Sequence, residues 1–205
     1  LSELRRQRAR VKAFLISGAG NDIIGEDPVT REPMMIGLLR DFNGDTSDVT
    51  GHVDSAAVNA RLSELSLGYN RMVGIVRAEP GLENLPIVVH GYDYAIPYPA
   101  GAGDRRNPRY AAKDQWLGRA FAARGIMDPD LRRRIVAVLI DRLYDMLFAL
   151  RDAPGQRGVH VVDCRGALPD VSHWADEIHG TSAGFAEVGR RFRRVIDDAL
   201  ATGRT

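Results

Sequence analysis

Residues 86–91 read PIVVHG, a short apolar run that ends in a glycine. Runs of this length, rich in β-branched residues and bounded by turn residues, are typical of a strand that is buried on both faces. Two further runs of the same kind are KAFLI at 12–16 and VHVVD at 159–163. We therefore predict three buried strands at these positions.

Helical patterns fill the segments between these runs. Apolar residues recur there at steps of three and four, which is the period of a helix with one buried face. Asp128 followed by Pro129 places a capping carboxylate before a proline at the first helical position, so a helix is expected to begin there. The expected helices cover residues 55–78, 116–123, 129–152 and 181 or 182 onward. Apolar strands separated by crossover helices predict an α/β fold, with a parallel sheet flanked by helices in one domain over residues 1–205.

Composition excludes several classes of function. The 28 basic residues nearly balance the 27 acidic ones, so no overall charge favours nucleic acid, and no apolar run has the length of a membrane span. Arginine clusters at 132–134 and 190–194 lie within helical patterns and are expected on solvated helix faces. The single cysteine, Cys164, rules out a disulfide within the chain. Because the first residue is Leu1 rather than Met, the sequence does not indicate a cellular location.

Polar residues follow each of the three apolar runs. Asn21, a candidate amide donor to an oxyanion, comes after the first run, and Tyr92 to Tyr94 come after the second. Asp176 lies three residues before His179, on the segment after the third run, and a carboxylate at that spacing can orient an imidazole base. Read alone, this pair also fits a helix cap beside a surface histidine. The carboxyl ends of parallel strands share one edge of a sheet, so all these residues are expected at one site.

The residues at two of these positions resemble a known family. SGAGND at 17–22 is similar to the Gly-x-Asn-Asp block of the SGNH (GDSL-type) hydrolases, and WADEIH at 174–179 is similar to their Asp-x-x-His block. HGYDY at 90–94 and Gly184-Phe185 also resemble members of the group. The resemblance extends over nearly the whole chain, from residue 12 to 192. It implies a flavodoxin-like three-layer sandwich.

This resemblance also implies an activity. The chain would belong to an ester hydrolase of the carboxylesterase, lipase or deacetylase type, with a Ser-His-Asp mechanism and no cofactor. Its substrate would be a small-molecule, lipid or carbohydrate ester. The residues implied are the general base His179, its orienting carboxylate Asp176, the oxyanion donor Asn21, and the pocket walls Tyr92, Tyr94 and Trp174.

The sequence departs from the family pattern in three places. Ala19 stands where the family has glycine, a mild change if the backbone there is not left-handed, and Gly180 stands where proline is frequent, which should loosen the loop. The third departure is the absence of a recognisable nucleophile, because no Gly-Asp-Ser block precedes Asn21. We expect Ser17 to be a buried strand-end hydroxyl rather than the attacking group, and Glu177→Gln to leave the rate of the intact enzyme nearly unchanged.

The missing nucleophile leads to an expectation about the sheet. The serine and the N-terminal strands of the family fold would lie upstream, which leaves the strand at 12–16 as an open edge. A partner segment or chain would complete the sheet there. Two other interpretations stay open: a metal-dependent hydrolase that uses His173, Asp176 and His179, and a non-catalytic module with the family fold.

Overall fold

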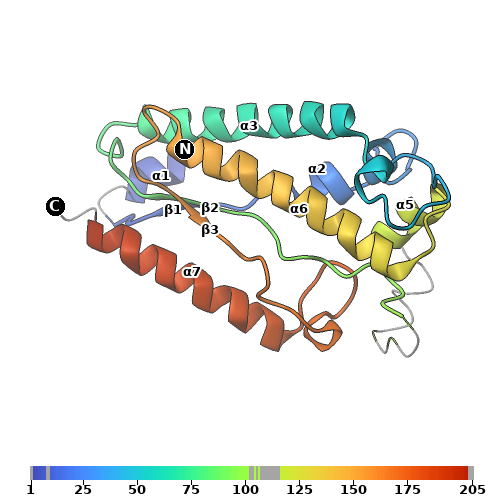
Figure 1. Ribbon diagram of the computed structural model, residues 1–205. Coiled ribbons are helices and arrows are strands. Elements are labelled where there is room, and N and C mark those ends of the chain that lie inside the picture. Colours follow the sequence, from blue (N-terminus) through green and yellow to red (C-terminus); the bar gives the residue numbers. More distant parts are fainter. Residues whose placement is uncertain (1, 8–9, 102–103, 105, 107–115, 203–205) are drawn as a thin grey trace.

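The computed structural model describes residues 2–7, 10–101, 104, 106 and 116–202. Within them the sheet has three strands, β1 (Phe14–Ile16), β2 (Ile87–His90) and β3 (Val159–Val162), in the order β1-β2-β3 (Figure 1). Both strand pairs are parallel, with Phe14 opposite Ile87 and Ile87 opposite Val159. The predicted strands and the α/β class with a parallel sheet are confirmed.

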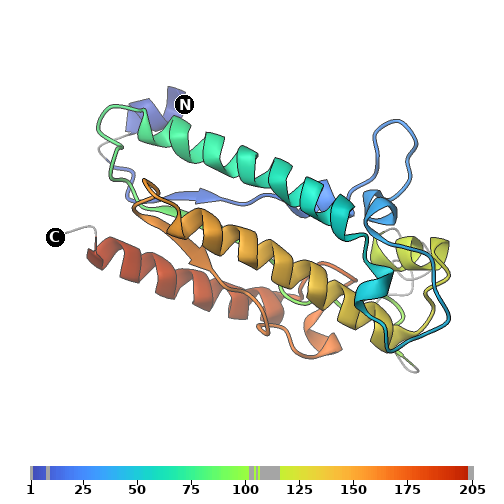
Figure 2. The same cartoon turned by 45° about the horizontal axis from the view of Figure 1, so that its top comes forward.

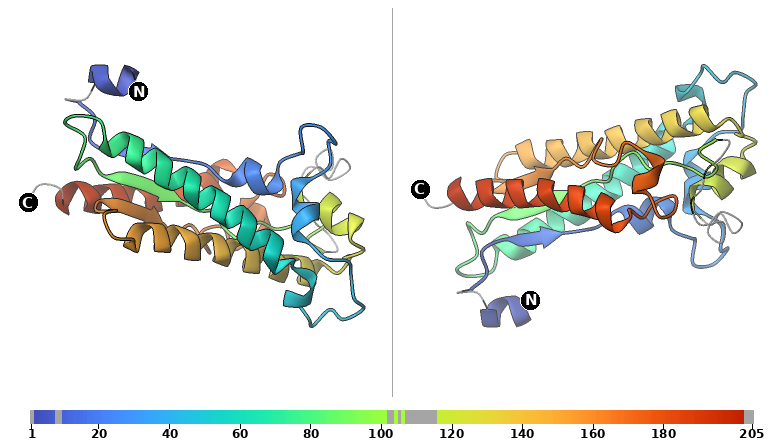
Figure 3. Two further views of the ribbon diagram at one scale, coloured as in Figure 1. Left: turned by 90° about the horizontal axis from the view of Figure 1, so that it is seen from above. Right: turned by 90° about the horizontal axis from the view of Figure 1, so that it is seen from below.

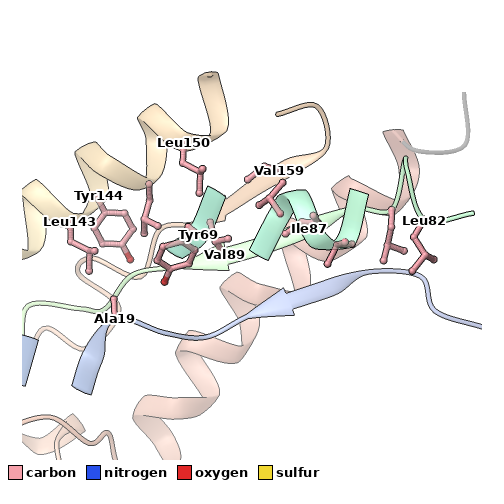
Figure 4. Packing of buried hydrophobic residues seen from close by; sticks show 13 residues of the cluster. Ala19, Tyr69, Leu82, Ile87, Val89, Leu143, Tyr144, Leu150 and Val159 are labelled. Carbon is pink, nitrogen blue, oxygen red and sulfur yellow. The ribbon is translucent and has the colours of Figure 1, made fainter. Parts of the chain in front are cut away.

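Helices cover both faces of this sheet. Two long helices, α3 (Ser55–Arg77) and α6 (Pro129–Asp152), lie side by side on one face, and α7 (Ser182–Thr202) lies on the other (Figures 1 and 2). Because side chains alternate along a strand, Ile87 and Val89 face the long pair while Val88 faces α7. Figure 4 shows the first of these interfaces, which contains Tyr69, Ile87, Val89, Leu143, Tyr144, Leu150 and Val159.

Side-chain caps fix where the two long helices begin. The carboxylate of Asp128 accepts a hydrogen bond from the Leu131 amide at 2.6 Å, and Pro129 occupies the first turn, as predicted. Asp54 caps α3 in the same way, through the Ala57 amide at 3.0 Å. Such caps satisfy amides that have no partner within the helix.

Shorter helices complete the fold: the first precedes β1, and the others lie in the segments between the strands and long helices. They are α1 (Ser2–Gln7), α2 (Gly20–Ile24), α5 (Leu117–Ala123) and the 3-10 turns η1 (Met34–Leu38), η2 (Thr50–His52) and η3 (Val171–His173). The sequence predicted a loop where α2 is found. Ile23 and Ile24 pack against a second apolar cluster around Phe121 and Ile135, and this burial stabilises a helical turn that local sequence does not predict.

The strand β1 lies at an edge of the sheet. Among the described residues it pairs with β2 alone, and Leu15 on its outer face is 49% exposed. Seen from below, α7 crosses β2 and β3 and leaves β1 to one side (Figure 3). The open edge that the sequence predicted is therefore present in the described part of the chain.

One arginine cluster differs from expectation. Arg132 is buried, at 2% exposure, and its guanidinium donates to the carbonyl oxygens of Ile126 at 2.7 Å and Tyr98 at 2.9 Å. The prediction of a solvated side chain was wrong because the loop at 96–98 folds over the start of α6. Arg193, on α7, is exposed as expected. In the described residues, no helix has the length and apolar character needed to cross a bilayer.

Candidate active site

Asp176 and His179 form a hydrogen-bonded pair. Nδ1 of His179 lies 2.8 Å from Oδ2 of Asp176, so the direct hydrogen bond expected from the sequence is confirmed. Oδ1 of Asp176 accepts the backbone amides of Ile178 at 2.9 Å and His179 at 2.7 Å. The carboxylate is buried while the imidazole is 55% exposed, and no described residue hydrogen-bonds to its Nε2. A carboxylate fixed in this way holds the ring and leaves Nε2 free to take a proton.

The surroundings of Asp176 favour its charged form. Burial acts to raise the pKa of this carboxyl, but the hydrogen bonds from Ile178 and His179 outweigh it, so the pKa lies below its ordinary value. Asp176 is therefore ionised at neutral pH. A buried negative charge at this distance stabilises the imidazolium that forms when His179 accepts a proton.

The loop that carries the pair is closed by its own backbone. Trp174 and Gly180 form an antiparallel bridge, and the amide of Ala175 donates to the carbonyl of His179 at 2.8 Å. A β-carbon on Gly180 would lie 3.0 Å from Cδ2 of Leu168, so the glycine is closely packed. The expectation that a glycine in place of proline loosens the loop stays a prediction.

Glu177, between the two residues of the pair, joins this loop to α5. The buried carboxylate accepts three backbone amides: Tyr98 at 2.7 Å, Leu117 at 2.9 Å and Gly118 at 2.9 Å. These contacts give Glu177 a structural role in holding the loop against α5. That Glu177→Gln leaves the rate nearly unchanged stays a prediction. The partners of Glu177 lie about 60 to 80 positions away in sequence, so no local pattern could have indicated them.

A cavity of about 550 Å³ opens beside this loop. Its polar wall comes from the segments that follow the strands and includes Ser17, Gly20, Asp22, His90 and His179. Its apolar wall includes Leu139, Ile140 and Leu143 of α6. The convergence of the three strand ends at one site, inferred from the order of the strands, is present in the structure.

The three aromatic residues predicted as pocket walls have different positions. Tyr92 and Trp174 line the cavity. The Tyr92 hydroxyl donates to the Gly18 carbonyl at 2.8 Å and accepts the Gly20 amide at 3.0 Å, and burial raises the pKa of this tyrosine. Tyr94 is not among the lining residues, and its hydroxyl donates instead to Asp141 at 2.8 Å.

The structure describes the backbone of Asn21 but not its side chain. The residue lies in α2, between Gly20 and Asp22, which both line the cavity. The expected direction of its amide falls outside the described part of the chain. Ala19 has a φ of +75°, a left-handed conformation that glycine adopts without strain. The change from glycine to alanine was expected to be mild only if the backbone here is not left-handed. Since it is left-handed, Ala19 is not a mild departure from the family pattern.

A second imidazole, His90, lines the same cavity. Its Nε2 lies 2.9 Å from Oγ of Ser17, and its Nδ1 lies 2.7 Å from the carbonyl oxygen of Gly91. Ser17 is exposed, so the expectation of a buried hydroxyl was wrong. The available signal was that both residues end a strand, and parallel strands bring such residues together.

The metal-dependent interpretation does not fit the geometry. Among the described residues, no three histidine, cysteine, aspartate or glutamate side chains gather closely enough to hold a metal ion. His173 lies in η3 while His179 lies in the following loop, so these residues do not share the face of one helix. The oxygens of Asp176 are already used by Ile178 and His179.

The arrangement combines an oriented base with a largely apolar cavity. Comparison with models of protein families, with curated proteins and with solved structures finds no match. Among the described serines only Ser17 lines the cavity, and its hydroxyl binds His90 rather than His179. The site can therefore accept a proton at His179, but a nucleophile for that base is not found among the described residues.

Proposed function

We propose that this chain is a C-terminal portion of an SGNH-type ester hydrolase, with His179 as general base and Asp176 as the carboxylate that orients it. The observation that carries the proposal is the 2.8 Å hydrogen bond between them, at the mouth of a cavity formed by strand ends. The three-stranded parallel sheet is compatible with the flavodoxin-like layout of that family.

The proposed reaction is acyl transfer to water. A serine hydroxyl attacks the ester carbonyl while Nε2 of His179 takes its proton, and Asp176 stabilises the imidazolium. The tetrahedral oxyanion is held by hydrogen-bond donors, among which we place the amide of Asn21. His179 then gives its proton to the departing alcohol. In the second half of the reaction His179 takes a proton from water as the water attacks the acyl-serine ester, and it returns that proton to the serine oxygen as the acid leaves.

We place the nucleophilic serine on a segment that precedes this chain and adds a strand to β1. Two observations support this: β1 pairs on one side only among the described residues, and Leu15 beside that edge is exposed. An unpaired strand presents free amide and carbonyl groups to an incoming strand. The strand would bring its carboxyl end, and the serine there, to the same rim as His179.

The test compares residues 1–205 alone with the same chain co-expressed with its upstream coding sequence. Both are assayed with a chromogenic short-chain ester and with a fluorophosphonate that labels activated serines. We expect turnover and labelling only when the upstream segment is present, and a loss of both with His179→Ala. Ser172→Ala is the matched control, since Ser172 is exposed and outside the cavity lining.

The second candidate function is a non-catalytic module with the same fold. It is favoured by the one observation that no described serine hydrogen-bonds to His179, since Ser17, the described serine in the cavity lining, bonds to His90 instead. An inactive chain in the presence of its upstream segment, or an upstream sequence without a Gly-Asp-Ser block, would favour this function over the hydrolase.

A further inference from the structure

The Ser17–His90 pair gives one part of the cavity wall a fixed hydrogen-bonding polarity. A carbonyl oxygen can only accept, so the 2.7 Å contact between Nδ1 of His90 and the Gly91 carbonyl requires a proton on Nδ1. In the neutral ring Nε2 is then an acceptor, and the Ser17 hydroxyl must donate its hydrogen across the 2.9 Å contact. The Ser17 oxygen is left with its lone pairs free.

The neutral form of His90 is supported by its surroundings. The ring packs edge-on against Phe192 of α7, with centroids 5.0 Å apart, and against Tyr92 at 5.6 Å. Burial lowers the pKa of His90 below its ordinary value, and the smaller effect of the Gly91 hydrogen bond does not reverse this. At neutral pH the ring therefore stays in the tautomer that the geometry requires.

Ser17 offers these lone pairs to the cavity. Its side chain is exposed, it lines the cavity, and no described residue other than His90 hydrogen-bonds to its hydroxyl. A ligand at this position must therefore bring a hydrogen-bond donor. Asp22, which lines the same cavity, adds negative charge and disfavours an anionic ligand.

We propose that Ser17 and His90 form a recognition site for a hydroxyl group on the alcohol part of the substrate. The substrate class is then an uncharged ester of a polyhydroxy alcohol, such as glycerol or a sugar, with its acyl chain along the apolar wall at Leu139, Ile140 and Leu143. Calling the ligand a substrate rests on the proposed ester hydrolase. Binding of a hydroxyl group at Ser17 does not depend on catalysis.

The experiment measures binding to residues 1–205 with two non-hydrolysable ethers. 1-O-Butylglycerol carries two hydroxyl groups, and butyl propyl ether has a similar apolar chain without them. Affinities come from titrations followed by NMR on isotope-labelled protein, and the same spectra report the tautomer of His90. We expect the diol to bind roughly fivefold more tightly than its partner, the value of one neutral hydrogen bond.

Two substitutions test whether Ser17 causes the preference for the diol. Ser17→Ala should remove the preference for the diol and leave the binding of butyl propyl ether unchanged. Ser172→Ala, an exposed serine outside the cavity lining, should keep the preference.

Four results would overturn the inference: equal binding of the two ethers, a preference that survives Ser17→Ala, no binding of either ether, or a His90 ring protonated on Nε2 in the free protein. Because these ethers cannot be hydrolysed, an absence of esterase turnover would count against the proposed function alone. Equal binding of the two ethers would count against this site and leave the hydrolase open.

Discussion

Replacing Asp176 by asparagine tests whether the carboxylate sets the tautomer of His179. Asparagine has nearly the same shape, and its one carbonyl oxygen can keep the backbone amides of Ile178 and His179, now at 2.9 and 2.7 Å. Its NH₂ group then faces Nδ1, where the 2.8 Å hydrogen bond stood. Two donors cannot bond to each other, so the ring proton should move from Nδ1 to Nε2.

The expected effects of Asp176→Asn on stability and on kcat follow from the change in this hydrogen bond. The hydrogen bond to a charged carboxylate, worth roughly 1.5–3 kcal/mol, is replaced by a neutral one worth roughly 0.5–1.5 kcal/mol, so the free energy of unfolding should fall by about 1–1.5 kcal/mol. With Nε2 protonated, His179 can no longer accept a proton, and kcat of the complete enzyme should fall by roughly ten-thousandfold at neutral pH.

The assay is the long-range nitrogen–proton NMR spectrum of the His179 ring, recorded on residues 1–205 and therefore independent of the nucleophile. The control is Asp170→Asn, since Asp170 is exposed and its side chain makes no cap hydrogen bond at η3. An unchanged His179 tautomer in Asp176→Asn would refute the reasoning, and Asp176 would then be a structural residue of the loop.

Three further predictions concern stability, measured by urea unfolding. Glu177→Gln should lower the free energy of unfolding by roughly 1–3 kcal/mol, because its amide cannot accept the Leu117 amide. Gly20→Ala should cost roughly 1–3 kcal/mol, because the new β-carbon would lie 2.7 Å from the Tyr92 hydroxyl. Acid should destabilise the protein through Asp104, whose pKa is about 2: burial opposes the charge, but hydrogen bonds from Arg106 and Ala100 outweigh it. A carboxyl with a lowered folded pKa stabilises above its unfolded value near 4, and this stabilisation is lost as pH falls toward 2.

Each of these predictions has a matched control. Glu64→Gln alters only an ion pair of a largely exposed carboxylate and should change stability by less than about 1 kcal/mol, against the larger loss at Glu177. Gly68→Ala lies inside α3 with no atom near its β-carbon, and should stabilise by roughly 0.5–1 kcal/mol. Asp104→Asn should flatten the acid limb of the pH profile. An unchanged free energy of unfolding in Glu177→Gln would contradict the Leu117 contact, and an unchanged value in Gly20→Ala would contradict the Tyr92 contact. An unchanged loss of stability at acid pH in Asp104→Asn would contradict the role of Asp104.

The parts of the fold that the sequence predicts are those with local causes. The three strands follow from short β-branched runs, and the start of α6 follows from Asp128 and Pro129. The Asp176–His179 hydrogen bond could be predicted because its partners are only three positions apart in the sequence. In each case the signal and the structure lie within one stretch of chain.

The parts that the sequence misses depend on contacts between distant segments. Two of the amides that bind the Glu177 carboxylate come from the start of α5, about 60 positions away in the sequence. Arg132 belongs to a polar cluster in the sequence, yet its guanidinium is buried under the loop at 96–98. The Ser17–His90 contact spans 73 positions and exists only because β1 and β2 are neighbours.

The Glu177 contacts also decide how the histidine loop can open. One carboxylate binds the amide hydrogens of Tyr98, Leu117 and Gly118, which belong to two different segments. Withdrawing it would leave three buried donors without partners, so the loop, the start of α5 and the turn at Tyr98 form one cooperative unit. We therefore expect hydrogen exchange at these three amides to proceed through one shared opening event, in which Leu117, a residue of the cavity wall, separates from the His179 loop.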